Sequence, residues 1–348
     1  MVIKVSALSL RTYLNRALIF ISKAKLGVQP LFGCVHLKAD KLYVYNGETG
    51  AAISMPFSVE KDILFYPFEL AKVVDSLPDD EEVELKIDVE ALDMKVKTST
   101  IKIKIRLVDP ANFPKLEVPE LETFEVLGIY RAVKNASFCT SDDASLPLLQ
   151  SIQISNTAVC ATDQRGVWQE KFESPHTFLV PLLLREHMNK LGTEPARIGL
   201  TDSQIFFFYA DMIMYGVRMS EEVKFPGVVK VLQQILTQEV ASTVKFDREA
   251  FQKRFAILRQ LPGKEEAIRL KCINGELTAE NVISDNNSTQ GTITLGVDST
   301  ADFDGVVVNG GLFENALDRF NNFKIMSDNK RIIFSNDTQT YGLTRKAL

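Results

Sequence analysis

A threefold internal repeat is the feature that most restricts what this sequence can fold into. One pattern recurs at a period of roughly 115–125 residues: a helix with one apolar face, strand-like segments around a polar turn, a second helix, and further strands. The opening helices are predicted over 8–25, 123–138 and 247–261. We therefore expect three similar domains, residues 1–119, 120–238 and 239–348, with linkers near 117–122 and 233–243.

The local chemistry of each copy favours the same mixed architecture. The second helices are expected to begin near Pro67, Pro181 and Val308. Proline is tolerated in the first turn of a helix because its missing N–H would have no partner there. The segment Ile101–Arg106 alternates isoleucine with lysine or arginine, which predicts a strand with one apolar and one basic face. The predicted fold class is α+β, with two helices packed on antiparallel sheet in every domain.

The composition excludes several classes of protein. With 45% hydrophobic and 24% charged residues, the chain is an ordinary globular sequence rather than a disordered one. No apolar run approaches the roughly 18–20 residues of a membrane span, and the N-terminus has no signal-peptide pattern, so we expect a soluble cytoplasmic protein without membrane contacts. Since the cysteines and histidines are far apart in sequence, a metal cluster or a catalytic dyad is poorly supplied, and no metal and no cofactor is assigned.

The net charge of −5 hides an uneven distribution. The six predicted helices carry more basic than acidic residues, whereas the rest of the chain carries an excess of acids, which favours one surface for a polyanion. Because no helix-turn-helix, zinc-finger or RNP pattern is present, DNA would be contacted through its phosphates, independently of base sequence. The residues predicted to make these contacts are Arg11, Arg16, Lys23, Lys25, Lys72, Arg131, Lys134, Arg185, Lys190, Arg248, Lys253 and Arg254.

Three short sequence motifs lie within the repeats: Asp109-Pro-Ala-Asn-Phe-Pro, Ala161-Thr-Asp-Gln-Arg-Gly and Val223-Lys-Phe-Pro. Together with the three copies and the basic helices, they resemble the bacterial-type DNA polymerase sliding clamp, the beta processivity subunit, over essentially the whole chain. The resemblance implies a head-to-tail homodimer that forms a ring of six domains, with helices lining a hole for double-stranded DNA. It also implies a non-catalytic protein that tethers the replicative DNA polymerase, with a clamp loader as a further partner.

The resemblance also implies a pocket for partner peptides between the second and third domains. Two departures from the family pattern affect this pocket: Arg165-Gly166 replaces a His-Arg pair, and Thr344–Leu348 replaces a Met-Pro-Met-type end. We therefore expect a partner motif adapted to this chain. The residues that correspond to the pocket are Leu149, Thr162, Gln164, Val167, Pro226, Lys230, Val231, Leu343, Thr344 and Leu348.

For ring closure, the resemblance implies pairing of the strand Ile101–Arg106 with an edge of the third domain of the other chain. Because the facing segment, 282–291, carries only Asp285 as an acid, we expect a dimer that dissociates readily. The residues assigned to this interface are Lys102, Ile103, Ile105, Ile257 and Leu258.

Two other functions remain open at this point. A metal-dependent nuclease could use the carboxylates of Asp79-Asp80-Glu81-Glu82 and Asp142-Asp143, although no further ligands are evident for a metal ion. A structural assembly protein would explain the triplication, but it gives no reason for basic helices in an otherwise acidic chain.

Overall fold

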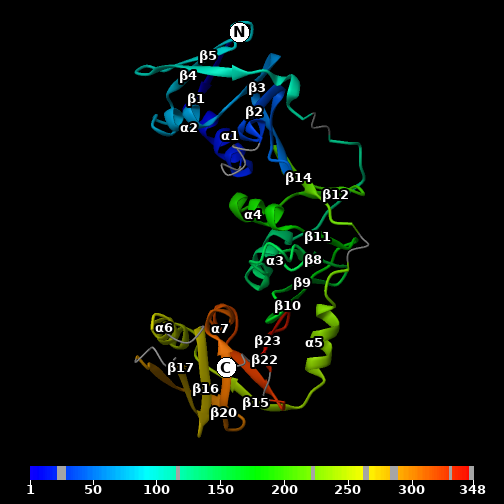
Figure 1. The fold of residues 1–348 in the computed structure, drawn as a ribbon, viewed down its shortest axis with the longest axis vertical. Coiled ribbons are helices and arrows are strands. Elements are labelled where there is room, and N and C mark those ends of the chain that lie inside the picture. Colours follow the sequence, from blue (N-terminus) through cyan, green and yellow to red (C-terminus); the bar gives the residue numbers. More distant parts are fainter. Residues whose placement is uncertain are drawn as a thin grey trace. The chain divides into compact units, whose positions relative to one another are not determined.

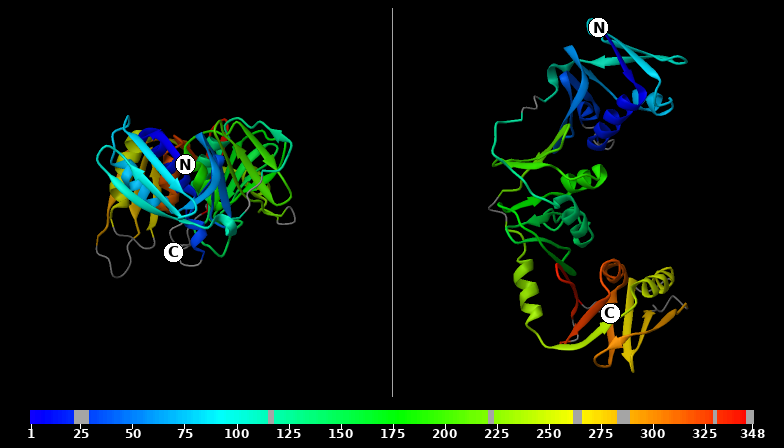
Figure 2. Two further views of the ribbon diagram at one scale, coloured as in Figure 1. Left: turned by 90° about the horizontal axis from the view of Figure 1, so that it is seen from above. Right: turned by 180° about the vertical axis from the view of Figure 1, so that it is seen from behind.

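The computed structural model describes residues 1–21, 29–114, 118–220, 224–261, 266–282, 289–328 and 331–344 (Figure 1). Their contacts divide the chain into two compact units, each of which combines helices with antiparallel strands (Figure 2). The first unit consists of Met1–Arg131 and Leu183–Ser220, and the second of Ala132–Leu182 and Glu221–Leu348. No helix among the described residues is both long and apolar enough to span a membrane.

The first unit is built on a ten-stranded sheet in the order β1-β4-β5-β6-β3-β14-β13-β12-β7, with β2 paired to β3. Helices α1 and α2 contact each other, and α1 also packs on β2 and β3. The elements are β1 (Val2–Ser6), α1 (Ala7–Phe20), η2 (Pro30–Gly33), β2 (Val35–Tyr45), β3 (Thr49–Phe65), α2 (Phe68–Asp75), β4 (Glu82–Asp88), β5 (Asp93–Lys97), β6 (Lys102–Val108), η3 (Pro110–Asn112), β7 (Thr123–Phe124), β12 (Arg197–Leu200), β13 (Gln204–Phe208) and β14 (Met212–Val217).

The second unit holds a nine-stranded sheet, β11-β8-β9-β10-β23-β22-β21-β15-β19, and a four-stranded sheet, β18-β17-β16-β20. Its elements are η4 (Ser137–Cys139), β8 (Ile152–Ile154), β9 (Ala158–Thr162), β10 (Gly166–Lys171), β11 (Phe178–Val180), α5 (Val228–Leu236), β15 (Val240–Lys245), α6 (Arg248–Arg259), β16 (Ala267–Ile273), β17 (Glu276–Asn281), β18 (Thr292–Gly296), β19 (Asp298–Ser299), β20 (Phe303–Asn309), α7 (Gly310–Leu317), β21 (Asn322–Met326), β22 (Arg331–Ser335) and β23 (Gln339–Thr344). Helices α3 (Ile129–Ala136) and α4 (Leu182–Leu191) each have residues in both units.

The opening helices form where a capping side chain precedes an apolar stripe. The Ser6 hydroxyl accepts a hydrogen bond from the Ser9 N–H at the start of α1, and the Asp247 carboxylate accepts one from the Ala250 N–H at the start of α6. In α6, Phe251 and Phe255 lie one turn apart and are fully buried. The α+β class with antiparallel sheets predicted from the sequence is confirmed.

Several element boundaries differ from the prediction. Helix α3 begins only at Ile129, because Thr123 and Phe124 form β7 and pair with β12. Helix α7 begins at Gly310, since the preceding two residues complete β20. The segment expected as a linker, 233–243, holds the end of α5 and the start of β15. The last residues of the predicted first helix, 22–25, lie outside the described residues.

Two similar joints make the large sheets continuous. Strand β3 pairs with β14, placing Gly50 opposite Tyr215, and β10 pairs with β23 close to Gly166 and Tyr341. Both tyrosines are buried, and neither hydroxyl has a hydrogen-bond partner among the residues that the structure describes. A Cβ on Gly50 would overlap the Tyr215 hydroxyl, and one on Gly166 would lie 2.7 Å from the Tyr341 hydroxyl. These sheets cross the boundaries that the repeat predicts, and the three-domain division stays a prediction.

We predict that Gly50→Ala and Gly166→Ala each lower the free energy of unfolding by about 1–3 kcal/mol, because the added methyl displaces a packed tyrosine. Thermal or denaturant unfolding measures the loss. Gly296→Ala is the matched control, since a Cβ there meets no atom within 4 Å. Equal stability of all three variants would contradict this account of the joints.

The first unit contains a buried histidine with a strongly lowered pKa. His187 in α4 is 3% exposed, its Nδ1 lies 3.2 Å from the Thr49 hydroxyl, and its ring packs edge-on against Phe20. Burial, helped by the nearby Lys190 charge, lowers its pKa to about 4. The imidazole is therefore neutral in the folded chain at neutral pH.

We predict that this histidine makes folding stability depend on pH between about 6.5, the ordinary pKa, and 4. Above that window the contribution is complete; as pH falls, the unfolded chain takes up a proton that the folded chain excludes, so up to about 3 kcal/mol is lost. Denaturant unfolding at several pH values should show a smaller loss for His187→Gln than for the parent chain. His176→Gln, at an exposed histidine, should keep the full loss.

Candidate nucleic-acid and partner interfaces

Arg11, the first basic residue of α1, holds α1 against the end of α2. Its guanidinium donates hydrogen bonds to the carbonyl oxygens of Val74, at 2.8 Å, and Leu77, at 2.5 Å, and forms an ion pair with Asp79. Val74 lies in the last turn of α2 and Leu77 lies two residues after its end, where helical hydrogen bonding leaves acceptors unpaired and the helix dipole is negative. The Arg11 side chain is therefore engaged within the fold and is only 22% exposed.

Three other predicted phosphate contacts also have partners or are buried. Arg16 forms an ion pair with Asp211, and Arg254 donates to the backbone carbonyl of Thr294. Arg185 is 7% exposed, so its guanidinium is not presented to a ligand. Lys23 and Lys25 lie outside the described residues.

The other predicted cations project from helices in both units. In the first unit, exposed basic side chains lie on α2, at the start of α3 and at the end of α4; in the second, they lie on α3 and α6. Because these side chains are exposed, a phosphate can approach them from the solvent. These exposed residues are Lys72, Arg131, Lys134, Lys190, Arg248 and Lys253.

The N-terminus of α3 is already occupied by a carboxylate that the sequence did not single out. Glu194 accepts hydrogen bonds from the backbone N–H groups of Tyr130, at 2.9 Å, and Arg131, at 3.1 Å. A helix N-terminus attracts anions, and here the chain supplies its own. A phosphate near α3 would therefore be contacted by the Arg131 side chain rather than by the helix end.

The described residues of the predicted peptide pocket lie in the second unit, several of them on or next to α5. The inner face of α5, Val228, Leu232 and Ile235, packs into a buried cluster with β9, while Val167 of β10 is partly buried against it. On the outer side, Val231 and Leu236 are 42% and 48% exposed, which is unusual for large apolar residues. Pro226 and Lys230 are also exposed.

The loop that joins β9 to β10 is held in one shape beside this helix. The Thr162 hydroxyl donates to the Gly166 carbonyl at 2.7 Å, and the Asp163 carboxylate accepts from the Gly166 N–H at 2.6 Å. Gln164 at the tip is exposed and has a φ of +74°. The Thr344 hydroxyl, at the end of β23, donates to the Arg165 carbonyl at 2.8 Å, so this loop and the end of the described chain are tied together.

The remaining pocket residues are placed less directly. Leu149 and Leu343 are buried, at 6% and 1% exposure, and therefore belong to the core that supports the surface. Leu348 lies outside the described residues. The structure thus brings Thr162, Gln164 and Thr344 together on one loop–strand junction, with Val167 linking that junction to α5.

Among the strands with an open edge in the described part of the chain, β6 and β18 are the two that bear on the predicted ring closure. Strand β3 pairs with β6 only at Leu107 and Val108, so Lys102–Arg106 hydrogen-bond to β5 alone. Strand β18 pairs with β17 alone and carries no charged residue. An uncharged open edge is a template for strand pairing. The facing segment expected at 282–291 lies largely outside the described residues, and the observed edge follows it in β18.

The predicted interface residues differ in how deeply they are buried. Lys102 is exposed and Ile103 is half-buried, whereas Ile105 is 6% exposed and faces the core. On α6, Ile257 is 63% exposed, whereas Leu258 is 1% exposed and belongs to the core. Ile257 is the large apolar side chain on α6 that a partner could cover.

Four of the six carboxylates considered for a nuclease make other contacts. Asp79 pairs with Arg11, Glu82 with Lys4 at 2.8 Å, and Asp143 accepts from the Ser145 N–H. The backbone and hydroxyl of Ser99 lower the pKa of Glu81. Within the described residues, no group of three or more His, Cys, Asp or Glu side chains is placed to hold a metal ion.

We predict that Arg11→Met lowers the free energy of unfolding by about 1–3 kcal/mol, because the carbonyls of Val74 and Leu77 lose the guanidinium as a donor and Asp79 loses its ion-pair partner. Thermal unfolding measures the effect. Lys72→Met, at an exposed cation on α2, removes the same charge and should leave the melting temperature almost unchanged. A larger loss for Lys72→Met than for Arg11→Met would contradict the capping role.

Comparison with solved structures gives full-length matches, although no protein-family model and no curated protein matches the sequence. The DNA polymerase III subunit beta of Pseudomonas aeruginosa has a TM-score of 0.85 at 16% identity, with both chains covered completely. The sliding clamp of Bartonella birtlesii, solved with griselimycin, has a TM-score of 0.86 at 16% identity and the same coverage. The beta sliding clamp of C. crescentus has a TM-score of 0.86 at 13% identity, covering 100% of this chain and 99% of that one. The chain therefore has the fold of these clamps.

Proposed function

We propose that this chain is a DNA sliding clamp: a non-catalytic ring that encircles double-stranded DNA and tethers the replicative polymerase. The observation that carries the proposal is the agreement of the whole fold with bacterial DNA polymerase III beta subunits, at TM-scores of 0.85–0.86 and complete coverage of this chain. A nuclease or an assembly protein has no comparable support; for the nuclease, four of the six candidate carboxylates make other contacts. The clamp acts in the cytoplasm, where the chromosome is copied.

In this proposal DNA is held by diffuse phosphate contacts. The exposed cations Lys72, Arg131, Lys134, Lys190, Arg248 and Lys253 lie on helices of both units and therefore supply positive charge at several points along a duplex. Contacts to phosphate alone carry no sequence information and weaken as salt rises. Such contacts permit sliding, and retention on DNA then depends on closure of the ring rather than on affinity.

Ring closure is assigned to the two open strand edges. The edge of Lys102–Arg106 on one copy pairs with the edge of β18 on the next, and Ile257 adds an apolar contact. Backbone pairing of this kind satisfies the unpaired N–H and C=O groups of both edges. Because β18 has no acidic residue to meet Lys102 or Arg106, electrostatic attraction adds little, and the dimer dissociates readily.

Polymerase and clamp loader are assigned to the surface around α5. Val231 and Leu236 offer exposed apolar side chains, and the loop with Gln164, tied to Thr344, forms the adjoining wall. An apolar peptide segment bound here would cover the exposed part of α5. The three-domain division, residues 1–119, 120–238 and 239–348, places this surface beside the boundary between the second and third domains.

A topological experiment tests the proposal. Lys102→Cys and Thr294→Cys place one thiol on each edge, and a short bis-maleimide joins them; the native cysteines at 34, 139, 160 and 272 are buried. Dimers joined on a nicked circular plasmid should stay bound through gel filtration in high salt and leave when a restriction enzyme cuts the circle. Equal retention on circular and linear DNA, or failure to form joined dimers, would refute the clamp.

Two variants test the contribution of Ile257 to ring closure: one changes Ile257, and the other is its control. Ile257→Lys should reduce the yield of joined dimers, because it places a charge in the proposed seam. Ile273→Lys, at a 41% exposed isoleucine on β16, makes the same change elsewhere and should not reduce the yield. Circular dichroism checks that both variants are folded.

A further inference from the structure

One face of three neighbouring strands in the first unit gathers basic residues. Strands β4, β5 and β6 (Figure 1 labels the first two) alternate charged with apolar residues, so the charged side chains lie on the face opposite to the core. On β5 and β6 this face holds five basic residues and one acid, Asp93. We call it the lysine face, and its basic residues are Lys86, Lys95, Lys97, Lys102, Lys104 and Arg106, all of them exposed.

The lysines of this face stand directly opposite one another on adjacent strands. Lys95 is in register with Lys86 of β4 on one side and with Lys104 of β6 on the other. Lys97 stands opposite Lys102 in the same way. Like charges directly opposite each other destabilise a sheet. The arrangement therefore has a cost that an anion bound across these strands would reduce.

The acids of the lysine face do not offset this charge evenly. Asp93 forms an ion pair with Lys104 at 2.7 Å, and this hydrogen bond holds the pKa of Asp93 below its ordinary value. The other acids are on β4, on either side of its lysine: Glu82, Glu84 and Asp88. Positive charge thus accumulates from β4 towards β6. Among the described residues, five cations of the face have no ion-pair partner within 4 Å: Lys86, Lys95, Lys97, Lys102 and Arg106.

Protection of an open edge does not explain the whole lysine face. Lysine on an edge strand discourages unwanted strand pairing, and Lys102 and Lys104 of β6 can serve that purpose. Lys86 and Lys95, however, lie on β4 and β5, which are paired on both sides. In the proposed ring, β18 would continue the sheet beyond β6 and would bring no charged residue to it. The lysines on β4 and β5 are thus left for a ligand.

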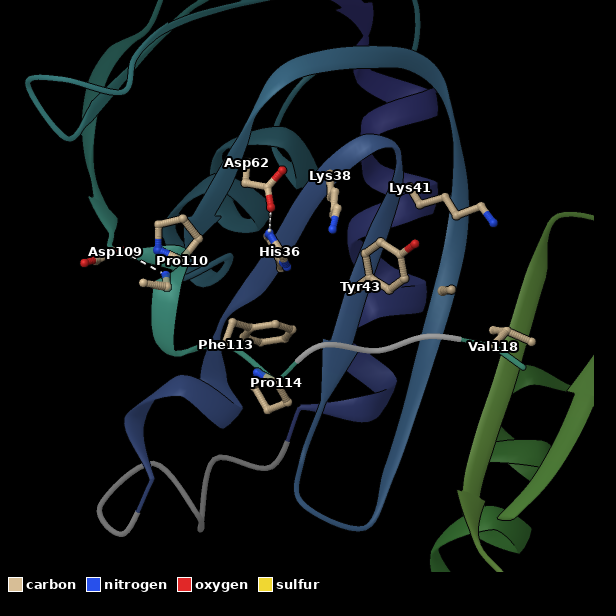
Figure 3. Close-up of a pocket in the computed structure, with 12 residues that line it drawn as sticks. His36, Lys38, Lys41, Tyr43, Asp62, Asp109, Pro110, Phe113, Pro114 and Val118 are labelled. Atoms are coloured by element: carbon tan, nitrogen blue, oxygen red, sulfur yellow. Dashed lines mark hydrogen bonds and ion pairs between the residues drawn. The ribbon is translucent and has the colours of Figure 1, made fainter. Parts of the chain in front are cut away.

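The pocket of the first unit, of about 630 Å³, has no such excess of charge (Figure 3). It lies beside a bend in β2, where Ala39 has a φ of +50°. Lys38 and Lys41 line it together with Asp62 and Asp109, so these charges balance. Lys38 is exposed on β2, outside the lysine face, and therefore provides a control position in the same unit.

The make-up of the lysine face selects its ligand. Strands β4, β5 and β6 contain no aromatic residue, so unpaired bases have no ring to stack on. Adjacent strands lie about 4.8 Å apart, and alternate residues of one strand about 7 Å apart, so the ammonium groups form a two-dimensional array. Double-stranded DNA carries one negative charge per about 1.7 Å of its axis and can meet such an array through phosphates alone.

We propose that the lysine face binds the phosphate backbone of double-stranded DNA, as a second contact separate from the cations on the helices. The inference rests on the proposed function only in supposing that a duplex is present beside the chain. Because the lysines lie on the side of the sheet opposite to the core, this contact adds to those of the helices. It is independent of base sequence and weakens as salt rises.

The first test uses dimers that are closed before DNA is added. Dimers joined through Lys102→Cys and Thr294→Cys cannot admit a covalently closed circular plasmid into their hole, although the face has lost one lysine. Binding to that plasmid in low salt must therefore use an outer surface, and we expect saturable binding that high salt releases. Absence of binding by joined dimers would overturn this inference and leave the clamp intact, whereas failure to form joined dimers would contradict the clamp.

The second test needs no closed ring. In the unjoined chain, Lys86→Gln with Lys95→Gln should lower the affinity for a short fluorescent duplex about tenfold in low salt. The slope of log affinity against log salt should fall by about 2, since each phosphate contact contributes about 0.9. The melting temperature should not fall, because the two lysines face each other and their repulsion is removed.

The matched control is Lys38→Gln with Lys61→Gln, which removes two exposed lysines from β2 and β3 of the same unit. Affinity and salt slope should stay those of the parent chain. Equal losses for both pairs would overturn the proposal, because the duplex would then respond to net charge alone.

Competitors identify the class of ligand. Unlabelled duplex should displace the fluorescent duplex better than polyglutamate or single-stranded oligothymidylate at the same concentration of charge. Stronger displacement by polyglutamate would indicate an acidic protein as the ligand, and stronger displacement by oligothymidylate would indicate a single strand. Either result would overturn the assignment to double-stranded DNA.

Discussion

The close approach of a glycine to a buried tyrosine is the contact on which the continuity of the large sheets depends. At β3 and β14 the pair is Gly50 and Tyr215, and at β10 and β23 it is Gly166 and Tyr341. In both places the tyrosine is followed by a second glycine, Gly216 or Gly342, whose missing side chain admits leucine or valine atoms. At each joint, therefore, two glycines leave space that the tyrosine ring and neighbouring side chains fill.

The joints also show that the repeat extends to details of packing. The same Tyr-Gly pair arrives from a later strand and meets a glycine of an earlier one, in two separate sheets. Each tyrosine hydroxyl remains without a partner in a buried position, which costs stability. The ring must then contribute enough packing to outweigh that cost, since Tyr341 also contacts Phe138 and Phe334.

The sequence was informative where structure is local. Apolar residues at helical spacing located α1, α2, α4, α6 and α7 to within a few residues, because each helix buries a stripe of its own. Helix α5 was missed, although Val228, Leu232 and Ile235 stand at helical spacing; the polar residues after it resembled a linker. The pairing of β3 with β14 joins residues far apart in the chain, and no local sequence pattern predicts such a contact.

Charged side chains were harder to assign than apolar ones. A helical face predicts that Arg11 points outward, but it does not reveal that the end of α2 supplies carbonyl acceptors within reach. The same applies to Arg16 and Asp211, which are distant in sequence. The bend of β2 at Ala39 was equally hidden, because a non-glycine residue with positive φ leaves no reliable signature. Exposed lysines, by contrast, were placed correctly on their helices.

The two strand edges to which the proposal assigns ring closure are different from each other, and this has a consequence for assembly. An interface between unlike surfaces leaves one free edge at each end of any unclosed chain of copies. The number of copies is then set by the angle between successive molecules, not by the strength of the contact. If a substitution near β6 or β18 altered that angle, the pairing proposed to close a ring would propagate as an open helical fibre.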